Sequence, residues 1–188
     1  SLAAVAVGRA VGLTPKQIEK GIASLEGVEG RMTHIDEGQD FTVIVDYAHT
    51  PDALENVLKT IQAIRQKQQR IITVVGCGGN RDAGKRPIMA ALAAQYSDQV
   101  VLTSDNPRFE DPELILDQMQ AGIPDVDKPH IIRISDRKQA IEQAINQFAK
   151  TGDIVLVAGK GHETYQDIQG VKHDFDDKQV TSEAFAKV

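Results

Sequence analysis

The feature that most limits the fold of this chain is a set of short, continuous apolar runs. "RIITVVG" (70–76), "QVVLTSD" (99–105) and "DIVLVAG" (153–159) are rich in β-branched residues. Such runs are typical of strands that are buried on both faces of a parallel sheet. Amphipathic helical patterns accompany them over 51–69, 87–96, 111–121, from Asp136 onwards and over 177–187. The alternation predicts an α/β fold with a Rossmann-like, mainly parallel sheet and helices on both of its faces.

Two further segments add strands to this sheet. "RMTHIDEGQDFTVIVDY" (31–47) predicts two short strands joined across a turn that contains glycine. "HIIRIS" (130–135) predicts one more strand. The acidic group Asp174, Asp176 and Asp177 predicts a solvated turn and the start of the last helix.

The first residues form a separate helical segment. "SLAAVAVGRAVG" has a helical pattern but no N-cap signal before it, which indicates a fragment of a longer protein. Thr14, followed by Pro15 and by Gln17, predicts the capped start of a second helix. We expect a boundary near Glu26–Arg31, so that 1–28 and 29–188 belong to different domains.

Composition and charge exclude several classes of function. The 188 residues are 41% hydrophobic and 26% charged, as in folded globular proteins. A net charge of −6 argues against a nucleic-acid partner. Neither a membrane-spanning run nor a signal peptide is recognisable, so we expect a cytoplasmic protein without membrane insertion. A monomer is a separate expectation. The single cysteine excludes an internal disulfide and a multi-cysteine zinc site.

Polar, glycine-rich loops follow four of the expected strands. In open parallel sheets, ligands bind beyond the carboxyl ends of the strands, so these loops are the expected site. They are "DYAHTPDA" (46–53), "GCGGNRDAGKR" (76–86), "SDNPRFEDP" (104–112) and "GKGHETY" (159–165).

Several short motifs in these loops are incomplete. "GNRDAGKR" (79–86) has the G-x-x-x-x-G-K spacing of a phosphate-binding P-loop, but Arg86 stands where a Ser or Thr hydroxyl is needed. "GHETY" (161–165) lacks the second His of a zinc-protease helix. Cys77 is better explained as a small apolar residue at a strand end than as a nucleophile.

Side chains of the remaining loop positions suit an amino acid with two charged ends. Arg81 and Arg108 could each bind a carboxylate, and Glu163 could accept from an ammonium. Asn106 offers a donor and an acceptor, and Pro107 fixes the backbone before Arg108. The alternative is structural: Asp105 pairs with Arg108, and Asn-Pro only starts a turn.

The first of the loops suits a nucleotide. Asp46 could accept from ribose hydroxyls, and Tyr47 or His49 could lie against an adenine ring. Arg31 could reach a terminal phosphate. Helix capping by Asp46 and Thr50 explains part of the same pattern equally well.

Five motifs in order, "GRM", "VDYAHTPDAL", "GCGGNRDAGKRP", "DNPR" with "EDP", and "AGKGHETYQ", resemble the Mur ligases, specifically those that add meso-diaminopimelate. The resemblance implies an end of the central ATPase domain over 1–28 and the C-terminal domain over 29–188. The family's P-loop, magnesium ligands and carbamylated lysine would lie upstream of this chain. Thr33 follows "GRM" where many relatives have Glu, which leaves the finer ATP contacts open.

The resemblance also implies residue roles and a reaction. The meso-diaminopimelate pocket would comprise Arg81, Asp105, Asn106, Pro107, Arg108, Gly159 and Glu163. Arg31, Asp46 and His49 would contact ATP. The reaction would use ATP and Mg²⁺ to add meso-diaminopimelate to UDP-N-acetylmuramoyl-L-alanyl-D-glutamate through an acyl phosphate. No catalytic residue and no metal ligand is expected in this chain, which should be inactive alone. A folylpolyglutamate synthase-like ligase and a non-catalytic nucleotide- or amino-acid-binding module are the alternatives.

Overall fold

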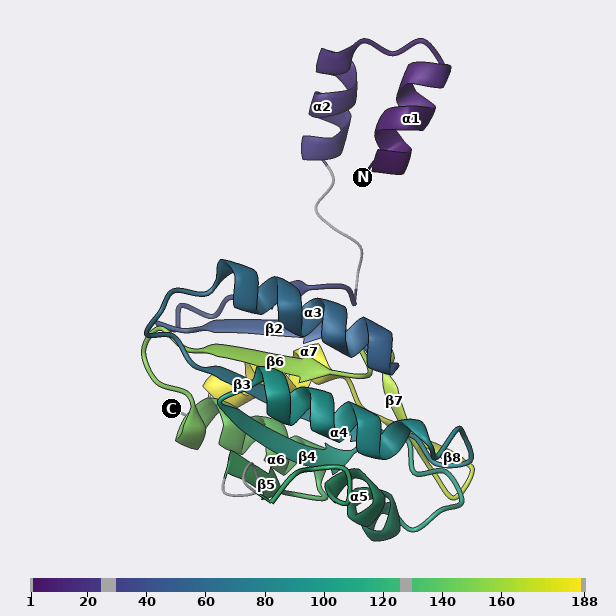
Figure 1. Ribbon diagram of the computed structural model, residues 1–188, viewed down its shortest axis with the longest axis vertical. Helices are drawn as coiled ribbons and strands as arrows, with labels where there is room; N and C mark the ends of the chain where they lie inside the picture. The colour runs from purple at the N-terminus through teal and green to yellow at the C-terminus, as the bar shows by residue number, and fades with distance from the viewer. Residues whose placement is uncertain (1, 25–29, 126–129, 187–188) are drawn as a thin grey trace.

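The computed structural model describes residues 2–24, 30–125 and 130–186 (Figure 1). Part of the expected boundary near Glu26–Arg31 lies outside the described residues. No helix among the described residues is both long and apolar enough to cross a lipid bilayer.

A six-stranded sheet forms the centre of the α/β body (Figure 1). The strand order is β1-β2-β6-β3-β4-β5, in which β1 is antiparallel to β2 and all other neighbours are parallel. The mainly parallel sheet predicted from the apolar runs is therefore confirmed. The bounds are β1 Thr33–Ile35, β2 Thr42–Asp46, β3 Ile71–Cys77, β4 Gln99–Ser104, β5 Ile131–Arg133 and β6 Ile154–Ala158.

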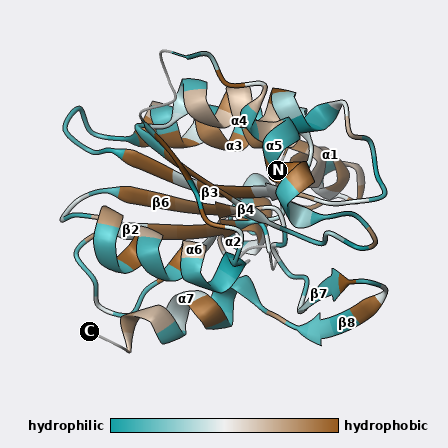
Figure 2. Cartoon of the chain, turned by 90° about the horizontal axis from the view of Figure 1, so that it is seen from below, coloured by the Kyte–Doolittle hydropathy of each residue, from teal (hydrophilic) through white to brown (hydrophobic). Residues whose placement is uncertain are grey.

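Helices cover both faces of the sheet, as Figure 2 shows by the apolar strands enclosed between two helical layers. One core lies between the sheet and three helices, α3 (Pro51–Ile64), α4 (Lys85–Tyr96) and α5 (Pro112–Gln120). The other core lies under α6 (Arg137–Gln143), the π-helical turn η2 (Ala144–Phe148) and α7 (Asp177–Phe185). The apolar side chains of β3 are divided between the two cores, Ile71, Val75 and Cys77 on one face and Ile72 and Val74 on the other, which explains why the strand is buried along its whole length.

The helix predicted over 51–69 ends earlier than expected. It stops at Ile64 because Arg65 adopts an extended conformation, and the Ile64 side chain is 67% exposed, outside the buried face that Leu54, Leu58 and Ile61 form. Thr50 caps this helix through its side chain, as predicted. The prediction of a solvated acidic turn before α7 is wrong for Asp177, which is buried, although Asp176 is the N-cap.

The first described residues form the helix pair α1 (Leu2–Ala10) and α2 (Pro15–Ala23). Thr14 and Gln17 form the predicted capping box at the start of α2. The two helices meet at Gly8, where an added Cβ would lie 2.8 Å from Cγ1 of Ile18. A glycine is therefore needed where the helices touch.

A small hairpin follows the last strand of the sheet. Strands β7 (Tyr165–Ile168) and β8 (Val171–Asp174) pair antiparallel. Arg108 pairs with Ile168 in an isolated parallel bridge, so the hairpin is attached to the loop after β4. This attachment shapes the candidate site.

Candidate functional site

A cavity of about 830 Å³ opens beyond the carboxyl ends of β2, β3, β4 and β6. All four loops singled out from the sequence contribute to it. Its lining residues are Tyr47, His49, Thr50, Pro51, Gly78, Arg81, Asp82, Gly84, Lys85, Ile88, Asp105, Asn106, Arg108, Gly159, Glu163 and Tyr165. The cavity thus brings together two guanidinium groups and three carboxylates from loops far apart in the sequence. Such a mixture suits a zwitterionic ligand.

The loop after β4 carries the most deeply placed polar groups. Asp105 is 8% exposed and Asn106 is 3% exposed. Asp105 Oδ1 lies 3.2 Å from Nζ of Lys160, so its charge is balanced by that lysine. The structural alternative that Asp105 pairs with Arg108 is therefore wrong.

Arg108 has an unusual backbone conformation that aims its side chain. Its φ is +52°, a region that non-glycine residues seldom adopt. Its Nη1 donates to the carbonyl of Gly79 at 2.9 Å, and its Nε lies 4.0 Å from Oδ2 of Asp167. One side of the guanidinium is thus anchored to the protein, while the residue still lines the cavity.

Glu163 faces this loop from the turn after β6. Its Oε2 accepts from Nδ2 of Asn106 at 3.0 Å, and its Oε1 accepts from the Tyr47 hydroxyl at 3.4 Å. Burial, followed by the Glu163 charge and hydrogen bond, raises the pKa of Tyr47. The phenol therefore stays protonated at neutral pH and remains a donor.

The other residues predicted to form the amino-acid pocket divide into two groups. Arg81 is exposed and lines the same cavity as Arg108 and Glu163, so the predicted convergence of these three residues is observed. Gly159 also lines it, with φ +124° and with its N–H donated to the Asp46 carbonyl. Pro107 is buried and lies outside the cavity lining.

Of the three residues predicted to contact the nucleotide, only His49 lines the cavity. Asp46 accepts from the backbone N–H groups of Met32 and Ala48, each at 2.8 Å, and it therefore braces two turns. His49 lines the cavity, and its ring lies 4.5 Å from that of Tyr47. Arg31 is exposed and does not line the cavity.

The incomplete motifs have structural roles. Arg86, which replaces the P-loop hydroxyl, is 1% exposed and forms an ion pair with Glu110 at 2.8 Å. Burial raises the pKa of Cys77 to about 12, so its thiol is protonated at neutral pH. Among the residues that the structure describes, no group of three or more His, Cys, Asp or Glu is placed to hold a metal ion.

Sequence reasoning missed the importance of Lys160 and of β7. Lys160 is fully buried, and Nζ lies 2.9 Å from Asn106 Oδ1 and 2.7 Å from the Tyr165 carbonyl. Two glycines flank this lysine, and Gly161 has φ +52°. A charged residue between glycines after a buried strand was the available signal.

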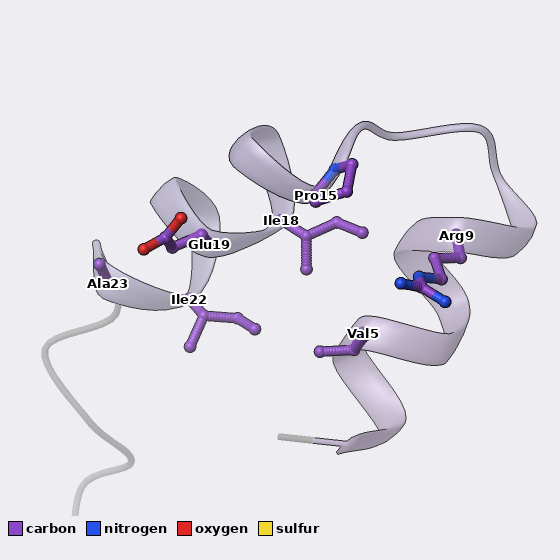
Figure 3. A pocket seen from close by; sticks show the side chains of 7 residues that line it. All are labelled: Val5, Arg9, Pro15, Ile18, Glu19, Ile22 and Ala23. Atoms are coloured by element: carbon purple, nitrogen blue, oxygen red, sulfur yellow. The ribbon is translucent and has the colours of Figure 1, made fainter.

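A second hollow lies on the helix pair and differs in character. It has a volume of about 400 Å³ and is mainly apolar. Figure 3 shows its lining side chains between α1 and α2, which are Val5, Arg9, Pro15, Ile18, Glu19, Ile22 and Ala23. It lacks the grouped polar side chains of the sheet cavity.

Comparison with known proteins agrees with the sequence motifs. A profile described as "Mur ligase, glutamate ligase domain" matches residues 30–161. The chain belongs to the Mur ligase family. A relative from Bacteroides fragilis, named UDP-N-acetylmuramoyl-L-alanyl-D-glutamate--2,6-diaminopimelate ligase, is 53% identical over 94% of this chain and 36% of its own length. The chain thus spans a little over a third of that relative.

Solved ligase structures resemble this chain to different degrees. A structure of a ligase with the same name is 44% identical to this chain, with a TM-score of 0.78, covering 98% of this chain and 37% of that one. A folylpolyglutamate synthase from Thermotoga maritima is 19% identical with a TM-score of 0.57, covering 78% of this chain and 31% of that one. The second likeness shows a shared fold alone.

Proposed function

We propose that this chain is the amino-acid-binding part of an ATP-dependent ligase that adds meso-diaminopimelate to UDP-N-acetylmuramoyl-L-alanyl-D-glutamate. The observation that carries the proposal is the single cavity shared by Arg81, Arg108 and Glu163. Two cations and an acid from separate loops match a ligand with two carboxylates and two ammonium groups. The 53% identity to a ligase of that name supports the same substrate.

Selectivity against lysine follows from charge balance around Arg108. The Arg108 side chain is 22% exposed, and its guanidinium is anchored to the protein on one side only. A carboxylate of the ligand would pair with the other side. Lysine lacks the second carboxylate, so its binding would close the pocket over an incompletely paired charge. Leaving a buried charge unpaired costs on the order of 3–5 kcal/mol. That cost is large enough for strong discrimination between the two amino acids.

The contribution of these residues to catalysis is positioning. Arg81 and Arg108 would hold carboxylates, Asp105 and Glu163 would supply the negative face of the pocket, and Gly159 would contribute its carbonyl because its N–H is used. Pro107 would act indirectly by fixing the loop. With the amino acid oriented, its amine can attack the acyl phosphate of the D-glutamate side chain.

On the nucleotide side we assign Arg31, Asp46 and His49 to ATP. The lone pairs of Asp46 that backbone N–H groups leave free can accept from ribose hydroxyls. Arg31 is exposed and can approach a phosphate. Bound ATP would supply the phosphoryl group that activates the carboxylate, and Mg²⁺ ligands are expected in another part of the ligase.

We further propose that 1–28 is the end of the central ATPase domain and that 29–188 is the C-terminal domain. The apolar hollow between α1 and α2 supports this division, because Val5, Ile18 and Ile22 line a surface that other apolar groups could cover (Figure 3). A cytoplasmic location, a monomeric state and peptidoglycan precursor synthesis complete the proposal.

Calorimetry of this chain with meso-diaminopimelate tests the proposal. We expect saturable binding of meso-diaminopimelate and much weaker binding of L-lysine. L-glutamate serves as a further control, since it is the amino acid expected of a folylpolyglutamate synthase-like ligase. Binding of L-glutamate in preference to meso-diaminopimelate, or absence of binding by all three, would overturn the assignment.

A further inference from the structure

The orientation of the Asn106 amide is fixed by its neighbours. Its Oδ1 lies 2.9 Å from Nζ of Lys160 and 2.9 Å from the backbone N of Asp167. An ammonium and a backbone N–H are both obligate donors, so the atom between them must be the amide oxygen. Its Nδ2 then faces Oε2 of Glu163 at 3.0 Å.

Lys160 is committed entirely to the protein. Its ammonium donates to Asn106 Oδ1 at 2.9 Å and to the Tyr165 carbonyl at 2.7 Å. It also forms ion pairs with Asp105 Oδ1 at 3.2 Å and with Glu163 Oε2 at 3.7 Å. The side chain is 0% exposed and does not line the cavity. It therefore cannot touch a ligand and can act only through the residues that it holds.

We propose that Lys160 is a positioning residue that makes Asn106 present only N–H donors to the cavity. An unrestrained asparagine offers either a donor or an acceptor, so it tolerates a carboxylate or an ammonium. Because Lys160 and the backbone N–H of Asp167 in β7 occupy Oδ1, only Nδ2 of Asn106 remains available to a ligand, and it can bind only a hydrogen-bond acceptor. Glu163 beside it is an acceptor, so the pair forms adjacent donor and acceptor halves.

This arrangement selects one orientation of an amino-acid end. The carboxylate of the zwitterion would lie on Nδ2 of Asn106, and its ammonium would lie on Glu163. The reverse orientation places an ammonium against N–H donors and a carboxylate against a carboxylate, which is repulsive on both sides. The inference deepens the proposed function, because it assumes that the cavity binds an amino diacid.

A double-mutant cycle in this chain tests the inference, with meso-diaminopimelate affinity measured by calorimetry. Lys160→Met keeps the length of the stem and removes the ammonium. We expect it to weaken meso-diaminopimelate binding at least tenfold. In an Asn106→Ala background, the same change should weaken binding less than threefold, because Lys160 acts through Asn106. If Lys160→Met lowered the affinity for meso-diaminopimelate equally in the wild-type chain and in Asn106→Ala, the inference would be overturned.

Selectivity gives a readout that a general loss of stability would not move. Lys160→Met should lower the ratio of the affinity for meso-diaminopimelate to the affinity for L-lysine. L-lysine lacks the second carboxylate, so it should lose less when Nδ2 of Asn106 is no longer held in place. An equal loss for both ligands would contradict the proposal. Lys150→Met is the matched control, since Lys150 is exposed, carries the same charge and does not line the cavity.

Asn106→Asp covers the case in which Lys160→Met does not fold. This change leaves Oδ1 with Lys160, replaces the donating Nδ2 by an acceptor oxygen and adds a negative charge. We expect meso-diaminopimelate binding to fall at least as far as in Asn106→Ala. Wild-type affinity in Asn106→Asp would show that no donor is needed there and would refute the inference. Failure of the wild-type chain to bind meso-diaminopimelate would instead refute the proposed function.

Discussion

Arg137 and Asp177 form a buried ion pair with 2.7 Å between Nη2 and Oδ2, and both side chains are 0% exposed. Nη2 of Arg137 also donates to the Ala158 carbonyl at 3.1 Å, at the end of β6. Burial alone would lower the pKa of Arg137, but the charge and hydrogen bonds of Asp177 outweigh it and raise the pKa. The pair therefore joins α6 and α7 to the strand end that precedes the cavity.

Breaking this pair should destabilise the chain strongly. We expect Arg137→Met to lower the free energy of unfolding by about 3–5 kcal/mol, because Asp177 would remain buried and unpaired. Urea unfolding would measure the loss. Lys138→Met is the control: its partner is Glu183, the two side chains are 46% and 43% exposed, and such pairs contribute about 0–1 kcal/mol. Similar losses for both variants would contradict the role given to Arg137.

Arg108 should govern affinity for the amino acid. We expect Arg108→Ala to weaken meso-diaminopimelate binding by roughly 30-fold or more, since removing one partner of a buried charge pair costs about 2–5 kcal/mol. In the complete ligase the Michaelis constant for ATP should change little. Arg65→Ala is the matched control, because Arg65 lies outside the cavity and pairs with Asp98. An unaltered affinity after Arg108→Ala would count against the pocket.

Gly161 should tolerate no side chain. Its φ is +52°, and an added Cβ would lie 2.6 Å from both the Gly30 carbonyl oxygen and Cβ of Tyr47. Gly38 also has a positive φ, +85°, but an added Cβ meets nothing within 4 Å. Gly38→Ala should therefore cost about 1 kcal/mol from backbone strain alone. Gly161→Ala should cost clearly more in urea unfolding and should also weaken ligand binding through Tyr47; equal costs would show that crowding is unimportant.

Cys77 should be unreactive in the folded chain. Burial raises its pKa from 9.0 to about 12, so the thiolate is scarce at pH 8. We expect a thiol reagent such as dithionitrobenzoate to label Cys77 only after unfolding in urea. Because the folded pKa is the higher one, the contribution of this group to stability is full below pH 9 and is lost as the pH rises towards 12. Rapid labelling of the native chain would contradict this.

The chain by itself should not catalyse ligation. Incubation with ATP, Mg²⁺, meso-diaminopimelate and the UDP-sugar dipeptide should release no ADP, because the P-loop is expected in another part of the ligase. Addition of the missing domains should restore turnover. ADP release that depends on meso-diaminopimelate in this chain alone would refute the division of labour proposed for the domains.

The sequence predicted the α/β class, the parallel sheet and the four loops because hydrophobic periodicity is a local signal. It also grouped Arg81, Arg108 and Glu163, because carboxyl ends of parallel strands meet at one edge of a sheet. It failed for the end of α3, where the apolar pattern continues through Ile64 but Arg65 is extended. It also failed for Asp177, whose buried partner lies 40 positions away.

The order of apolar runs, turn residues and motifs thus determined by itself the fold class, the place of the cavity and its charged composition. Only the tertiary structure decided which groups remain available inside it. Lys160 and the backbone of β7 occupy the oxygen of Asn106, and Lys160, not Arg108, balances Asp105. Such pairings depend on distances of about 3 Å between distant loops, and local sequence patterns do not encode those distances.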